Sequence, residues 1–153
     1  MTNIDQIDLR ILRILQRNGR ISNAELAEEV NLSHSACHRR LKILVDQSVI
    51  RSFVALVDAG AVNLKSTVFV EIKLIKQVDE VLEEFERAVR LIPEVLECYL
   101  MAGSADYLLK VSVKDTEDFE RVHRKHLSRL PNVLNMVSSF ALRKVHYSTA
   151  LPI

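Results

Sequence analysis

Hydrophobic positions recur at helical spacing over the first third of the chain. Residues 4–18 place isoleucine or leucine every three or four positions, which predicts an amphipathic helix. Ser22 and Glu25 have the spacing of a capping box, so a second helix is predicted to begin there. Ser33 is the expected N-cap of a third helix that runs to about residue 47. Because only about three residues separate the second and third helices, the pattern predicts a helix-turn-helix.

The rest of the chain has β-type alternation broken by helical segments. Residues 49–57 are rich in aliphatic, β-branched and aromatic side chains, which predicts a short hairpin or wing. Residues 58–66 have the composition of a linker. The later elements are expected as strand 67–76, helix 78–91, strand 95–102, strand 107–114, helix 116–130 and strand 133–147. This order is the ferredoxin-like βαββαβ arrangement.

The predicted fold class is therefore α+β, with two domains in one chain. We expect a winged helix-turn-helix domain over residues 1–57, a linker over 58–66 and a ferredoxin-like domain over 67–153.

Two helices can cover only one face of the predicted sheet. On the first strand, Val68 and Val70 belong to the apolar side, whereas Phe69 and Glu71 belong to the mixed side. An uncovered sheet face that still holds apolar groups is typical of a protein–protein contact. We expect a homo-oligomer in which two such sheets face one another, and we expect Val111 on this uncovered side.

Composition limits the class of protein. The 153 residues are 48% hydrophobic with a net charge of +1, which excludes a highly charged disordered chain and a uniformly basic nucleic-acid coat. Two cysteines are too few for a disulfide scaffold and fit a reducing compartment. The uncharged runs are too short to span a membrane, so a soluble cytoplasmic protein is expected.

Positive charge is concentrated on the third predicted helix. Residues 34–42 contain three basic side chains and no acid. Arginine can donate two hydrogen bonds to guanine, and a helix N-terminus can bind phosphate. Such a helix can also be merely solvated, but its place in a helix-turn-helix favours DNA. The predicted DNA-binding residues are Ser33, His34, Ser35, His38, Arg39, Arg40 and Lys42.

The turn between the two central strands is a second candidate site. Gly103 permits a sharp bend, and Asp106 can accept hydrogen bonds from an α-ammonium group. Free backbone N–H groups in such a turn can bind a carboxylate. The alternative is a hairpin turn in which both residues serve geometry alone.

No catalytic, metal or cofactor site is predicted. His123 and His126 have helical i, i+3 spacing, but no CxxC, HExxH or carboxylate cluster accompanies them.

Three segments taken together resemble one family of transcription regulators. They are IDQIDLRILRILQRNGRIS (4–22), NLSHSACHRRL (31–41) and GSADYLL (103–109). In order and spacing they resemble the Lrp/AsnC, or feast/famine, family. The resemblance implies a winged helix-turn-helix that binds double-stranded DNA and a ferredoxin-like domain that binds a small effector, an amino acid. It also implies assembly into dimers or octamers.

The resemblance further implies that the effector lies between subunits near the turn. Two departures from the family pattern are His34, where proline is frequent, and Ser104, where an acid is frequent. The effector-binding residues implied are Tyr99, Met101, Gly103, Ser104, Asp106, Tyr107, Ser138, Ser139 and Phe140.

Two alternative functions remain open on the sequence. Siroheme decarboxylases resemble the family in both domains, and such an enzyme would use basic groups in the second domain. The groups available are His123, Arg124, His126 and Arg143. The other alternative is an architectural DNA-binding protein that ignores amino acids.

Overall fold

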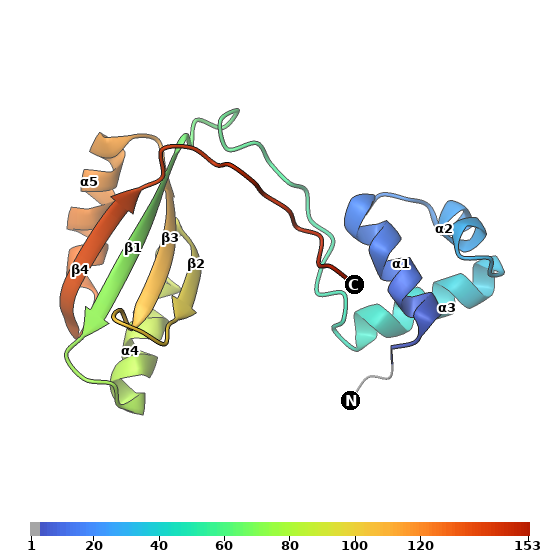
Figure 1. Cartoon of the computed structure of the whole chain (residues 1–153), viewed down its shortest axis with the longest axis horizontal. Coiled ribbons are helices and arrows are strands. Elements are labelled where there is room, and N and C mark those ends of the chain that lie inside the picture. Colours follow the sequence, from blue (N-terminus) through green and yellow to red (C-terminus); the bar gives the residue numbers. More distant parts are fainter. Residues whose placement is uncertain (1–3) are drawn as a thin grey trace. The chain divides into compact units, whose positions relative to one another are not determined.

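The chain folds into two units, each with its own hydrophobic core (Figure 1). The computed structural model describes residues 4–153, so residues 1–3 of the predicted first domain lie outside the described part. The first unit contains the chain up to Leu56 together with Val145–Ile153, and the second contains Val57–Lys144.

Three helices form the first unit: α1 (Gln6–Arg17), α2 (Asn23–Glu29) and α3 (His34–Asp46). Asn31 has a φ of 56°, so the chain turns through a left-handed residue between α2 and α3, and the predicted helix-turn-helix is confirmed. The three helices enclose one small core. Its buried residues are Ile11, Leu26, Ala27, Val30, Cys37 and Leu44.

Side chains at the helix starts satisfy backbone groups that have no helical partner. The capping box of Ser22 and Glu25 is confirmed at the start of α2, and the Ser33 hydroxyl caps α3. α1 begins with a further capping box. There the Asp5 carboxylate accepts from the backbone N–H of Asp8, and the Asp8 carboxylate accepts from that of Asp5.

The segment after α3 differs from the expected wing hairpin. Residues 51–57 are irregular, and no strand of the described chain pairs with them. Phe53 and Val54 are exposed, with 53% and 73% of their surface accessible. The β-rich composition of this segment is therefore not enough to form strands, because a strand needs a neighbour for its backbone hydrogen bonds.

The second unit is a four-stranded antiparallel sheet with two helices on one face, as the βαββαβ order predicts (Figure 1). The strands lie in the order β2-β3-β1-β4. The elements are β1 (Ser66–Leu74), α4 (Asp79–Val89), β2 (Val95–Leu100), β3 (Tyr107–Val113), α5 (Thr116–Lys125) and β4 (Val133–Phe140).

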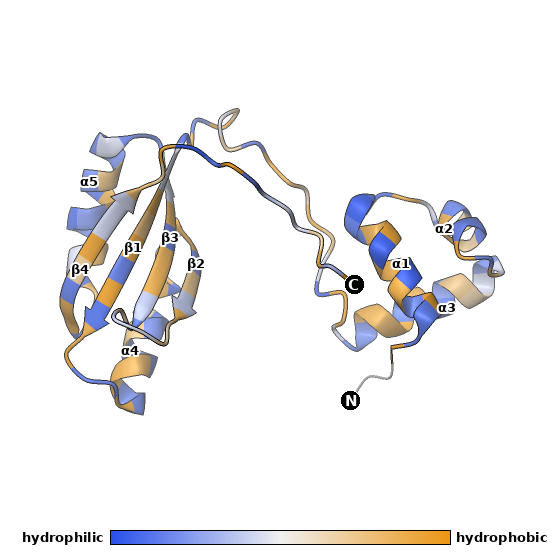
Figure 2. Ribbon diagram, viewed as in Figure 1, coloured by the Kyte–Doolittle hydropathy of each residue, from blue (hydrophilic) through white to orange (hydrophobic). Residues whose placement is uncertain are grey.

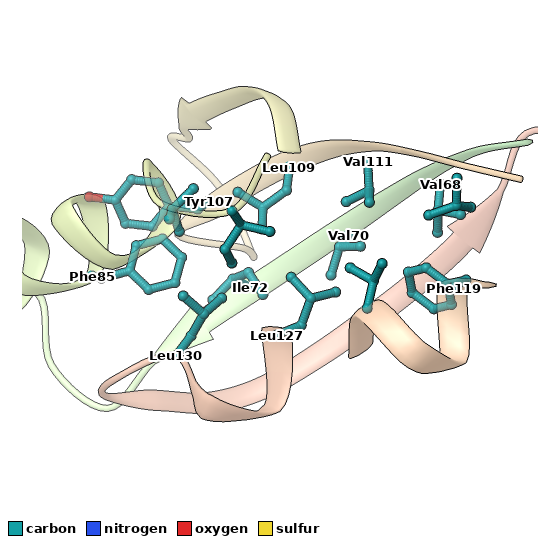
Figure 3. Packing of buried hydrophobic residues seen from close by; sticks show 14 of the residues in the cluster. Val68, Val70, Ile72, Phe85, Tyr107, Leu109, Val111, Phe119, Leu127 and Leu130 are labelled. Atoms are coloured by element: carbon teal, nitrogen blue, oxygen red, sulfur yellow. The ribbon is translucent and has the colours of Figure 1, made fainter. Parts of the chain in front are cut away.

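The register of the central strands decides which side chains enter the core. Val68 and Val70 of β1 pair with Val111 and Leu109 of β3, and all four are buried against the helices (Figure 3). Hydrophobic and polar positions alternate along β1, which gives the sheet one buried and one open face (Figure 2). The expectation that Val111 lies on the open face is wrong, because its strand partner Val68 belongs to the apolar side.

The two largest differences from the predicted bounds are at the ends of the last strand and of the last helix. The last strand stops at Phe140, and the chain then continues without strand pairing to the end. The helix expected over 116–130 is α5 followed by a separate 3₁₀ turn at Leu127–Arg129. Within residues 4–153, no helix is both long and apolar enough to cross a membrane.

Candidate DNA-binding helix and effector site

α3 presents one exposed polar surface and one buried surface. Cys37 and Leu44 are buried beneath the helix, whereas His34, His38 and Arg39 are exposed. Among residues 4–153, none of these three exposed side chains has a hydrogen-bond or ion-pair partner. Donors that are free in this way can meet base edges and phosphate oxygens without first breaking a contact in the protein.

Arg40 is held inside the first unit, although it follows Arg39 directly. Its Nη1 lies 2.7 Å from Oδ2 of Asp5 and 2.9 Å from Oδ1 of Asp8, and its side chain is 28% exposed. These hydrogen bonds raise the pKa of Arg40. The arrangement ties α3 to the start of α1. Arg40 therefore has a positioning role within the protein that the sequence did not reveal.

The N-terminal end of α3 is exposed and fixed in place by α2. The Ser33 hydroxyl accepts from Ala36 N–H at 3.2 Å and lies 3.3 Å from the Ser35 hydroxyl. The Asn23 side chain donates to the His34 carbonyl at 3.0 Å. Lys42 forms an exposed pair with Asp46, which contributes little stability and leaves the ammonium group available. Six of the seven predicted DNA-binding residues therefore share one exposed surface.

The uncovered side of the sheet, here called the open face, combines apolar and charged side chains. At one end, Glu97 forms an ion pair with Lys110 and accepts from the Tyr99 hydroxyl. Lys110 first, and Tyr99 second, lower the pKa of Glu97 through these hydrogen bonds. The open face consists of Phe69, Glu71, Lys73, Glu97, Tyr99, Leu108, Lys110, Asn135, Val137 and Ser139.

A hollow of about 200 Å³ lies at the other end of the open face. Its charged groups are Glu71 and Lys73, and Glu71 has no hydrogen-bond or ion-pair partner within the described residues. The exposed turn after β2 contributes to one wall, and β4 contributes to the opposite wall. The lining residues are Glu71, Ile72, Lys73, Ser104, Ala105, Asn135 and Val137.

Asp106 is buried beneath this hollow, and its carboxylate accepts hydrogen bonds from residues of its own chain. Its Oδ2 accepts from Leu74 N–H at 2.7 Å, and its Oδ1 accepts from Lys73 at 3.0 Å and from the Gln77 amide. The backbone N–H of Leu74 is the main cause that lowers the pKa of this carboxyl group, with Lys73 and Gln77 adding to it. Asp106 therefore joins the start of β3 to the end of β1 and fixes the ammonium group of Lys73 near the hollow.

The other residues implied in effector binding are divided between the two sides of the sheet. Tyr99 and Ser139 belong to the open face, and Gly103, Ser104 and Met101 lie in the exposed stretch between β2 and β3.

The remaining three lie on the side that carries the helices. Tyr107 is buried, stacks 4.6 Å from Phe85 and donates its hydroxyl to Glu86 at 2.8 Å. Burial and this hydrogen bond raise its pKa. Ser138 and Phe140 pair with helix-facing residues of β1, and Phe140 contacts Phe119 at 5.2 Å between ring centroids. In this chain Tyr107 is a core residue, and these three side chains do not line the hollow.

The hollow also brings together residues that the sequence had not singled out. Glu71 pairs with Val137 and Lys73 pairs with Asn135 across β1 and β4, although these partners are far apart in the chain. The available signal was a glutamate and a lysine on the polar side of a central strand, a pattern that exposure to solvent alone also explains.

Two of the four basic residues considered for an enzyme belong to α5. Arg124 pairs with Glu120 on the outer surface of α5, and His123 lies 6.1 Å from the Phe119 ring. Both are on the helix-covered side of the sheet, whereas the hollow is on the open face. No group of three or more potential metal-ligating side chains occurs within residues 4–153.

Comparison with known families accounts for both units. Residues 67–151 match the Lrp/AsnC ligand binding domain, and residues 4–51 match a winged helix-turn-helix DNA-binding domain. The chain belongs to the Lrp/AsnC family. It is a DNA-binding transcription regulator of the Lrp/AsnC type, as the resemblance of its motifs implied.

Individual relatives of this Lrp/AsnC regulator cover most of its length. It is 39% identical over 143 residues to the proline dehydrogenase transcriptional activator of Rhizobium radiobacter, which covers 94% of the chain and 92% of that protein. It is 41% identical over 130 residues to the leucine-responsive regulatory protein of Haemophilus influenzae. This match covers 85% of the chain and 78% of that protein. A transcriptional regulator of Neisseria meningitidis, solved in complex with L-methionine, matches with a TM-score of 0.90 at 38% identity, covering 97% of this chain and 96% of that one.

Proposed function

We propose that this regulator binds a specific DNA sequence through α3 and that an amino acid, bound at a subunit interface, changes this binding. The observation that carries the proposal is the exposed polar surface of α3, on which His34, His38 and Arg39 have no side-chain partner within residues 4–153, in a chain that also contains the hollow on the open face. His34, Ser35, His38 and Arg39 are the proposed base-reading residues, and Lys42 is a proposed phosphate contact. Ser33 presents the N-terminal end of α3 to the DNA backbone.

The chemistry of the hollow supports an amino acid as effector. A free amino acid carries one ammonium group and one carboxylate, and the hollow offers the unpaired Glu71 carboxylate and the Lys73 ammonium group. Ala105 and Val137 supply apolar surface for a side chain. The solved regulator from Neisseria meningitidis binds L-methionine, which adds support from a relative.

The open face supports a homodimer as the working unit. Phe69, Tyr99 and Val137 are 38%, 52% and 50% exposed there, although they are large hydrophobic or aromatic side chains. A two-fold dimer through this face buries them and places a second subunit over the hollow. The two α3 helices of such a dimer then read the two halves of a pseudopalindromic site.

Fluorescence anisotropy tests the proposal. The purified full chain is titrated onto labelled DNA from upstream of its own gene, at about physiological salt and with excess random DNA. The titration is repeated with an equimolar mixture of the twenty amino acids. We expect binding that survives the competitor and a dissociation constant that changes with the mixture.

Two results contradict the proposal. If random DNA removes all binding to the upstream fragment and to a library of genomic fragments, α3 does not read sequence. If DNA binding is specific but ignores every amino acid, and calorimetry detects no amino acid binding, the effector part of the proposal is wrong. The architectural function then becomes the better account.

A further inference from the structure

The end of the chain returns to the DNA-binding unit and lies against α1. The Gln16 side chain donates to the Leu151 carbonyl at 3.3 Å and accepts from the Leu151 N–H at 2.6 Å. One side-chain amide thus satisfies both backbone groups of Leu151, as a neighbouring strand does in a sheet. Arg13, one helical turn before Gln16, donates its Nε–H to the Ile153 carbonyl.

This terminal segment starts beside the linker at one end of the sheet. Val68 of β1 pairs with Phe140 of β4, and Ala141 N–H donates to the Thr67 carbonyl at 2.9 Å. The chain therefore enters and leaves the second unit at adjacent points. The linker leads back to the C-terminal end of α3, and the terminal segment leads to α1.

The terminal segment is irregular and mostly exposed where it lies against α1. Residues 141–153 form no helix or strand, and Val145 and Leu151 are 82% and 68% exposed. The hydrogen bonds that Gln16 and Arg13 of α1 make with the backbone of this segment are also exposed. Each such bond adds little net stability in water, so docked and released states of the segment differ little in free energy. A small bias from the effector-binding unit is then enough to shift the balance between them.

We propose that Val145–Ile153 is a strap whose docking on α1 carries the state of the effector-binding unit to the DNA-binding unit. The docking site is the Gln16 amide together with the Arg13 guanidinium, and its occupant is the backbone of residues 151–153 of the same chain. This inference rests on the proposed function, because a strap can couple two sites only if both sites bind ligands.

Two variants of the full chain test the strap. Gln16→Ala removes both hydrogen bonds to Leu151 and keeps a good helix former on α1. Gln6→Ala is the matched control, since Gln6 is an exposed glutamine of the same helix whose side chain has no partner among residues 4–153. Hydrogen exchange of the C-terminal peptide is measured first, without DNA or amino acid.

We expect exchange at the end of the chain to be about tenfold faster in Gln16→Ala than in the wild type and in Gln6→Ala. Equal exchange in all three proteins overturns the docking. This measurement needs no effector, so it stands whether or not the proposed function is correct.

The second measurement is the ratio of the DNA dissociation constants with and without the twenty-amino-acid mixture. We expect this ratio to fall toward one in Gln16→Ala, to keep its wild-type value in Gln6→Ala, and calorimetric amino acid binding to be equal in all three proteins. A full wild-type ratio in Gln16→Ala overturns the coupling role. A ratio of one already in the wild type shows instead that the proposed function has failed, and the coupling role fails with it.

Discussion

Arg40 in the middle of α3 is fixed to Asp8 in the first turn of α1, with 2.9 Å between guanidinium Nη1 and carboxylate Oδ1. Asp8 is only 13% exposed, and it also accepts from the backbone N–H of Asp5, the residue that caps α1. α3 is thereby oriented by the capping residues of α1. We therefore expect different tasks for two adjacent arginines of α3: Arg39, which has no partner within residues 4–153, contacts DNA, whereas Arg40 holds the helix in position.

The first prediction separates these two tasks. Arg39→Ala is expected to weaken binding to the specific DNA site by about 1–3 kcal/mol, the range for a bidentate guanine contact, with an unchanged melting temperature. Arg40→Ala is expected to lower the free energy of unfolding by about 1–2 kcal/mol, because the Asp8 carboxylate loses its partner. Anisotropy on specific and random DNA, together with thermal unfolding, measures both effects.

A double-mutant cycle provides the control. Asp8→Asn breaks the same contact from the α1 side, so its stability loss and that of Arg40→Ala should not add in the double variant. The assignment of tasks is contradicted if Arg40→Ala loses DNA affinity at full stability or if Arg39→Ala keeps full discrimination between the two DNAs.

The second prediction concerns Asp106 and pH. The hydrogen bond from Leu74 N–H, with help from Lys73 and Gln77, holds the pKa of Asp106 below its ordinary value of 3.8. The stabilisation is therefore present above the ordinary pKa and is lost as the pH falls through the lowered pKa of the folded state. Asp106→Asn is expected to lower the free energy of unfolding by about 1–3 kcal/mol near neutral pH.

Denaturant unfolding of the wild type and of Asp106→Asn across the acidic range tests the direction of this change in stability with pH. The difference between the two proteins should begin to shrink below about pH 4, where the carboxyl group of the unfolded wild type takes up a proton. It should level off once the pH is below the lowered pKa of the folded state. Other carboxylates with lowered pKa values, such as Glu97 and Asp118, titrate in both proteins and cancel in the difference. If the difference in free energy of unfolding between the two proteins is constant with pH, the Asp106 carboxylate is not the stabilising group.

Local sequence signals were sufficient for most of the fold. The capping residues Ser22 and Ser33 mark helix starts because their hydroxyls bond to backbone groups only three residues away. The alternation along β1 defines two faces for the same local reason. Residues 51–57 have strand-like composition but remain irregular, because strand formation depends on a neighbour that composition does not specify.

The candidate sites depended on contacts between distant segments, and there the sequence was less informative. Arg39 and Arg40 are equivalent in the sequence, and only the packing of α1 against α3 distinguishes them. Asp106 resembled a ligand-binding carboxylate because its partners Leu74 and Gln77 come from another strand end. The side of the sheet on which Val111 lies follows from strand register, which a shift of one residue inverts.

The third prediction concerns Gly103, which the chain's own geometry does not require. Its φ is not in the left-handed range, and a Cβ added there meets no atom within 4 Å. Gly103→Ala should therefore leave the melting temperature unchanged. If a ligand or second subunit approaches this turn, the added methyl group is expected to weaken amino acid binding by about tenfold.

Isothermal titration calorimetry and thermal unfolding measure the two effects of this substitution. Gly19→Ala is the matched control, because its added Cβ makes only ordinary contacts of 3.7 and 3.8 Å in the DNA-binding unit. Unchanged amino acid affinity in Gly103→Ala would remove the turn from the effector site.

The fourth prediction tests the open face as the dimer contact. Phe69 lies opposite Lys110 on β3, so Phe69→Glu places a carboxylate beside a lysine and is tolerated in the single chain. In a dimer formed through this face, the same carboxylate is buried against the second subunit at a cost of several kcal/mol. Light scattering should therefore show Phe69→Glu with the 17.5 kDa mass of one chain and the wild type with a multiple of it.

Leu142→Glu, at a fully exposed position after β4, should keep the wild-type mass. If Phe69→Glu also keeps that mass, the subunits associate through another surface, and the hollow is not covered by a partner sheet.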